Sequence, residues 1–151
     1  MNQGRLADVF PYLEDEAQNA ICTAHEYRSK TLALIRSSFE EPERSRMEET
    51  YREEGDAAGP SSLWEILALR HGWDARLRGD LSGVESVEVV GQRATVVTAR
   101  GTRYPFRRAA SGVWGLSLFT ADLMVQKDRA PRDFHVMEQA ASDYDRARRQ
   151  R

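Results

Sequence analysis

Three histidines, His25, His71 and His135, are the side chains best suited to acid–base or metal chemistry. They do not have a metal-binding spacing such as H-x-x-x-H, so only carboxylates could complete a site around any of them. Glu26 follows His25 directly, whereas Asp133 and His135 are two residues apart, which on a helix directs their side chains away from each other. The spacing therefore predicts no metal site and no cofactor, and each histidine is interpreted as structural.

The single cysteine, Cys22, excludes an internal disulfide and a cysteine metal cluster. Its position beside Ile21 in the middle of a predicted helix favours a buried, inert thiol, and only His25, three residues later, argues for a reactive one. The chain contains no G-x-S-x-G, P-loop or G-x-G-x-x-G pattern, and its glycines fit turns. No catalytic residue is predicted, and a non-enzymatic protein is favoured over an enzyme.

Arginines gather in a stretch without acidic residues. Positions 89–121 hold five arginines and no Asp or Glu, although the whole chain has a formal net charge of -2. Alternation in the predicted strands places arginines on one side and aromatic residues on the other. A nucleic-acid surface needs both on one face, so nucleic-acid binding is disfavoured and pairing with helix carboxylates is favoured. The candidate anion-binding residues are Arg93, Arg103 and Arg107.

Four short strands are predicted to position these side chains, over 84–90, 93–100, 102–108 and 113–119. Gly91-Gln92 fits a two-residue hairpin turn, and the simplest topology is an antiparallel meander. Pro105 cannot donate a ladder hydrogen bond, so the third strand is expected to bulge there or to lie at an edge. One face is expected to collect Ala94, Val96, Tyr104, Phe106, Trp114, Leu116 and Leu118.

Helices are predicted on both sides of the strands. The first runs from Pro11 to Phe39 and carries a stripe of small residues in its middle. A charged helix follows over Glu43–Glu54, ended by Gly55 in a left-handed cap. Ser62 and Glu65 fit a capping box for a third helix. Near the C-terminus, Pro131 is expected to kink a helix or to start a new one.

The elements together predict one α+β domain, with the N-terminal helices and the C-terminal helix packed on one face of the four-stranded sheet. Its expected parts are helices over 8–79, strands over 84–119 and C-terminal helices over 121–149. A length of 151 residues with 40% hydrophobic content suits a single core. No stretch approaches the roughly 18 apolar residues of a membrane span.

The first five residues lack the apolar core of a signal peptide. A cytoplasmic protein is therefore expected. The alternative is a periplasmic or lipid-anchored mature form whose export signal has been removed.

The segments Tyr104–Arg108 and Ser111–Leu116 place an arginine- and aromatic-rich strand before a Gly turn and a Trp-containing strand. With the preceding helices, this order resembles the nuclear-transport-factor-2-like superfamily, including small bacterial domains of unknown function. The resemblance covers roughly residues 61–119, and the helical C-terminus departs from it. It implies a cone-like sheet over a cavity that binds a small ligand, performs simple acid–base chemistry or serves as a scaffold.

The leading functional hypothesis is a non-enzymatic binding or structural module that associates with itself or with another protein. The small-residue stripe of the first helix and the charged arm at 40–54 motivate it. A second hypothesis is a pocket between sheet and helices that binds a small molecule or performs acid–base catalysis. A third is anion or nucleic-acid binding through the strand arginines. The candidate ligand-binding residues of the second hypothesis are His25, Tyr27, Trp64, Tyr104 and Trp114.

Overall fold

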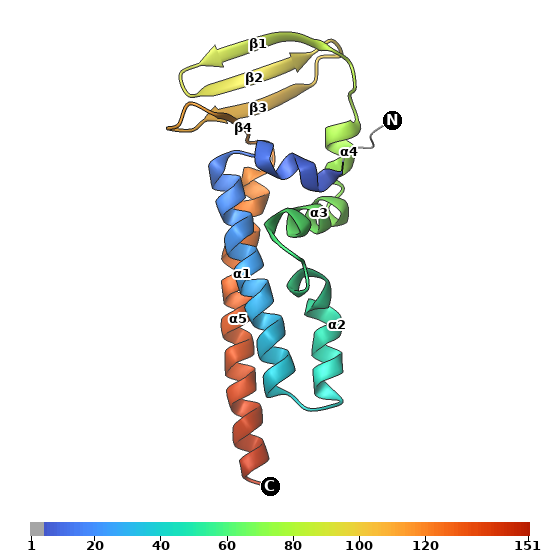
Figure 1. Cartoon of the computed structure of the whole chain (residues 1–151), viewed down its shortest axis with the longest axis vertical. Coiled ribbons are helices and arrows are strands. Elements are labelled where there is room, and N and C mark those ends of the chain that lie inside the picture. Colours follow the sequence, from blue (N-terminus) through green and yellow to red (C-terminus); the bar gives the residue numbers. More distant parts are fainter. Residues whose placement is uncertain (1–4) are drawn as a thin grey trace.

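The structure, a computed structural model, describes residues 5–151, so the start of the segment on which the export expectation rests (1–4) lies outside the described residues. It confirms the α+β class: helices at both ends of the chain flank a four-stranded antiparallel sheet. The sheet lies at one end of an elongated helical bundle (Figure 1). No helix in the described part of the chain has the length and apolar content that crossing a bilayer requires.

Two long helices, α1 (Asp15–Ser38) and α5 (Thr120–Arg149), lie side by side and form the axis of the molecule (Figure 1). The small residues Ala17, Ala20 and Ala24 of α1 are almost fully buried, which allows close approach of neighbouring elements. α5 continues past Pro131 without interruption, so no new helix begins there.

The N-terminal helix is split, unlike the single helix expected from Pro11. A 3-10 helix, η1 (Leu6–Tyr12), contains Pro11, and α1 begins only at Asp15. The intervening Leu13 and Glu14 are extended, because they pair with the last strand of the sheet. A local helical pattern could not reveal this tertiary pairing.

Three shorter helices follow: α2 (Glu43–Gly55), α3 (Pro60–Arg70) and α4 (Trp73–Arg78). The expected capping box is wrong, because α3 starts at Pro60 after Gly59 and has no side-chain cap. Gly55 is not left-handed either. It is required by packing, since a Cβ there would lie 2.6 Å from Leu32 Cβ.

The strands form the expected meander in the order β1-β2-β3-β4: β1 (Val84–Val90), β2 (Arg93–Thr98), β3 (Arg103–Arg108) and β4 (Trp114–Leu116). Pro105 is accommodated without a bulge in the β2–β3 ladder. β4 pairs only with Phe106–Arg108, and beyond it the Pro105 carbonyl accepts a hydrogen bond from the Ser117 N–H at 3.0 Å.

The main core lies below the sheet, where η1, α1, α3 and the start of α5 meet. Trp64 is fully buried there and packs against Trp73 and Phe119, with ring centroids 5.8 and 5.5 Å away. A second cluster around Ile35, Phe39 and Met137 holds the far end of α1 against α5. Neither cluster buries β1, whose residues are all exposed.

Candidate interaction surface

The five candidate ligand-binding residues are dispersed over the molecule. His25 Nε2 lies 2.9 Å from the Ala57 carbonyl oxygen, and the Tyr27 ring packs against Phe134 at 5.7 Å between centroids. Trp64 belongs to the core, where its indole N–H donates to the Leu6 carbonyl at 2.9 Å. The Tyr104 hydroxyl donates to the Arg76 carbonyl at 3.4 Å. No two of the five candidates line one of the main clefts.

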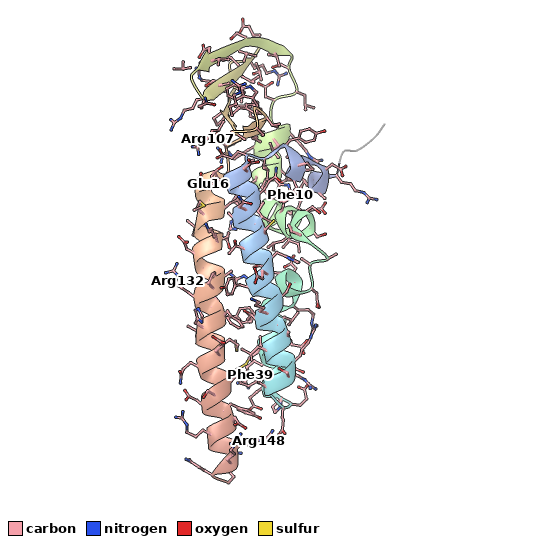
Figure 2. All side chains as sticks on the ribbon, turned by 60° about the vertical axis from the view of Figure 1, so that its left-hand side comes forward. Phe10, Glu16, Phe39, Arg107, Arg132 and Arg148 are labelled. Atoms are coloured by element: carbon pink, nitrogen blue, oxygen red, sulfur yellow. The ribbon has the colours of Figure 1, made fainter. Side chains whose placement is uncertain are left out.

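Trp114 does line a cleft, of about 230 Å³, between the β3–β4 hairpin and the start of α1. Arg107 crosses this junction above Glu16 (Figure 2), with 3.0 Å between its Nη1 and Glu16 Oε2. Its Nε lies 3.4 Å from the buried Glu14 carboxylate, which also accepts a hydrogen bond from the Thr120 hydroxyl. The cleft therefore lies at an interface between the sheet and the bundle that ion pairs hold together.

The three candidate anion-binding arginines, Arg93, Arg103 and Arg107, share one face of the sheet, as alternation predicts. Arg107 pairs with carboxylates from the start of α1, in agreement with the favoured interpretation, whereas Arg103 pairs at 2.6 Å with Glu88 of β1. Arg93 lies opposite Arg107 in the ladder and is exposed. Two of the three candidate anion-binding side chains are thus already neutralised within the chain.

The features that suggested self-association lie elsewhere than expected. The small-residue stripe of α1 is buried inside the chain, so it offers no surface to a second molecule. The charged helix α2 lies along α1 (Figure 1), and Arg36 of α1 pairs with the middle of α2 through Glu48 at 3.3 Å and with its C-terminal cap residue Asp56 at 3.0 Å. Cys22 is exposed, so the expected buried thiol is wrong.

The edge of the sheet at β1 is open along its whole length. In Figure 1, β1 is the strand farthest from the bundle, and no other element of residues 5–151 lies beyond it. The opposite edge is covered: the Glu14 N–H donates to the Leu116 carbonyl at 3.0 Å, and Leu13 bridges to Leu116. The sheet therefore has one covered edge and one that can accept another strand.

The β1 edge carries apolar side chains on both faces. Val87 and Val89 lie on the face of Ala94 and are 57% and 59% exposed, and Val90, on the other face, is 80% exposed. Natural sheets protect open edges with lysine, proline or a covering segment, and β1 has none of these. Its two glutamates, Glu85 and Glu88, and a register irregularity near Val84 are the only such features.

Backbone geometry determines which β1 groups are free. The two-residue turn makes Val90 and Arg93 the pair next to the turn, and hydrogen-bonded pairs alternate from there. The N–H and C=O groups of Glu88 and Val90 then face β2, and those of Val87 and Val89 point out of the sheet.

Asp80 fixes the start of this edge. Its carboxylate accepts the Ser82 N–H at 2.9 Å and the hydroxyls of Ser82 and Thr98, which join the loop before β1 to the end of β2. Hydrogen bonds from Ser82, Thr102 and Thr98 hold the pKa of Asp80 well below its usual range. An ionised Asp80 therefore anchors β1 at neutral pH.

Sequence reasoning found β1 but not its exposure on both faces, because alternation of valine with polar residues also describes a strand with one buried face. No group of three or more His, Cys, Asp or Glu within residues 5–151 is arranged to hold a metal ion.

No family model, curated protein or solved structure matches the chain. The resemblance to the nuclear-transport-factor-2-like superfamily stays a prediction.

Proposed function

We propose that this protein is a non-enzymatic interaction module that assembles with a second copy of itself through antiparallel pairing of the β1 edges. The observation that carries the proposal is the contrast between the two sheet edges. Leu13 and Glu14 cover β4, whereas β1 is uncovered and exposes valines on both faces. The pairing satisfies the outward backbone groups of Val87 and Val89 and joins two four-stranded sheets into one.

The β1 sequence is self-complementary in one register. With Val87 opposite its symmetry mate, each Glu88 faces Ser86, so no like charges oppose each other over the regular part of the strand, 86–90. Moving the axis to Glu88 would place two glutamates directly opposite, which is destabilising. Moving it to Val89 would shorten the ladder.

Access to the edge favours a second copy as the occupant. The bundle leads away from the sheet on the side opposite to β1 (Figure 1), so a two-fold copy meets no helix as it approaches. A single edge-to-edge contact buries little surface compared with an obligate dimer. We therefore expect dimerisation to depend on protein concentration.

Cysteine crosslinking tests both the dimer and its register. In a Cys22→Ser background, Val87→Cys should form a disulfide dimer on mild oxidation, because cross-strand Cα atoms about 5.5 Å apart permit the bond. Val90→Cys is the matched control: in this register the two copies of residue 90 are about 20 Å apart. A mixture of Ser86→Cys and Glu88→Cys proteins should form crosslinked heterodimers, because in this register these two residues face each other within the regular part of the strand.

The crosslinking experiment tests the register, and sedimentation tests whether the dimer forms. Equal crosslinking of the Val87→Cys and Val90→Cys proteins would contradict the register. A wild-type chain that sediments as a monomer at every concentration would overturn the assembly itself.

A further inference from the structure

A charged cleft lies in the helical bundle, away from the sheet. It opens between α1, α2, α3 and α5, has a volume of about 250 Å³, and we name it the Arg28 cleft after its most buried lining residue. Its charged walls are Arg28, Glu54, Arg70, Arg129 and Asp133. None of these residues takes part in the proposed pairing of the β1 edges.

Arg28 is held in place at the bottom of this cleft. Only 6% of the residue is exposed, its Nε lies 2.8 Å from Glu54 and its Nη1 lies 2.6 Å from Asp133. Its remaining nitrogen, Nη2, has no hydrogen-bond partner within residues 5–151. Nη2 therefore keeps its donors free of any group in that part of the chain, and Arg28 lines the cleft.

Arginines outnumber carboxylates in the lining of the cleft. Three guanidinium groups and two carboxylates line it, and a third carboxylate, Glu53, pairs with Arg70 from outside the lining at 2.9 Å. Glu54 lies between Arg28 and Arg70, and Asp133 lies between Arg28 and Arg129. Each carboxylate is therefore neutralised by two arginines and acts to position them.

Arg129 is the arginine with most freedom to meet a ligand. Its closest carboxylate contact is 3.7 Å, from Nε to Asp133, and its side chain is 64% exposed. Its two terminal nitrogens are thus available at the mouth of the cleft. Arg70, in contrast, uses both of its terminal nitrogens on Glu53 and Glu54.

Neutral hydrogen-bonding groups complete the lining. The Thr50 and Tyr51 hydroxyls and the Gln126 amide have no hydrogen bond to another group in the described part of the chain. The ring of His71 is stacked on Trp73, with 5.0 Å between centroids. The cleft therefore combines fixed guanidinium groups with uncharged donors.

We propose that the Arg28 cleft binds a phosphoryl group carried by a small molecule, either inorganic phosphate or a phosphate monoester. Guanidinium groups bind oxyanions through paired, charge-assisted hydrogen bonds. The hydrogen-bond donors of Arg28 and Arg129, together with those of the uncharged lining residues, are more than the two oxygens of a carboxylate can accept. They suit the three or four oxygens of a phosphoryl group. The volume exceeds that of phosphate alone and leaves space for a small organic group.

The test is a titration of the full-length protein, followed by isothermal calorimetry and by amide NMR shifts at constant ionic strength. The probes are inorganic phosphate and phenyl phosphate, with acetate as the carboxylate comparison. We expect saturable one-to-one binding of both phosphates, weaker binding of acetate, and NMR shifts at Arg28, Thr50 and Arg129. Tighter binding of phenyl phosphate would identify an ester as the ligand, and tighter binding of phosphate the free ion.

Arg129→Gln should weaken phosphate binding by about tenfold, the effect of losing one charge-assisted contact. Arg132→Gln is the matched control, because Arg132 lies on the same helix (Figure 2), is exposed and, among the described residues, bonds only to the Asp128 carbonyl. Both substituted side chains are partly or largely exposed, so the fold should persist. Absence of saturable binding, or equal weakening in the two variants, would overturn the proposal.

Discussion

At the scale of single residues, the hydrogen bonds around Asp80 make the stability of the sheet edge depend on pH. They lower the folded-state pKa of this carboxyl below its ordinary value of 3.8. A carboxyl with a depressed folded pKa contributes stability above its unfolded pKa and loses it as pH falls through the folded value. Asp80 therefore stabilises the fold at neutral pH, and this contribution declines below about pH 4.

Asp80→Asn is expected to be less stable than wild type at pH 7, and the difference should shrink between pH 4 and pH 2. Urea unfolding at several pH values measures this. Asp128→Asn provides a control, because Asp128 is exposed on α5. A stability difference for Asp80→Asn that does not change with pH would show that the carboxylate charge is irrelevant.

At the scale of elements, Gly115 permits the covered edge of the sheet. A Cβ at this position would lie 2.4 Å from Glu14 Cα and 2.6 Å from Glu14 N, both rigid backbone atoms. Gly115→Ala should push Leu13 and Glu14 away from β4 and cost about 1–3 kcal/mol, as overpacking usually does. Chemical denaturation measures the loss.

Gly83→Ala is the control for that substitution, since nothing lies within 4 Å of its added Cβ and its φ is not positive. We expect its stability to be unchanged or slightly increased. If both alanines cost the same free energy, the close approach at Gly115 would not be the reason for its glycine.

Individual elements were largely predictable because their signals are local. The alternation of Val84–Val90 and the turn at Gly91 predicted a hairpin that the structure confirms. The split at Leu13 was not predictable, because it depends on pairing with Leu116, about a hundred residues away in the chain. The same holds for the Arg28 cleft, since Arg28 meets Asp133 across a sequence separation of 105 residues.

At the scale of the whole molecule, the sheet sits at the end of the bundle instead of lying along it (Figure 1). Alternation correctly assigned Phe106 and Leu116 to one face of the sheet, and Leu116 is buried. It could not indicate that the cover of this face stops short of β1, although Ala94 of β2 is still buried. Coverage depends on where η1 and the long helices begin, so Val87 and Val89 share the core face and are still exposed.

This arrangement predicts the shape of the assembly. The 30 residues of α5 span about 45 Å, and the bundle leads away from β1. Pairing of two β1 edges places the bundles at opposite ends, so the maximum dimension in small-angle X-ray scattering should nearly double on dimerisation. Association through the bundles would widen the particle and leave its length almost unchanged.

Val87→Lys should restore the monomer length, because lysine at a strand edge opposes pairing. Val136→Lys is the control: this valine of α5 is 69% exposed and lies away from the sheet edge, so its substitution should leave the dimer length unchanged. A dimer that keeps the monomer length would place the interface on the helices and contradict edge pairing.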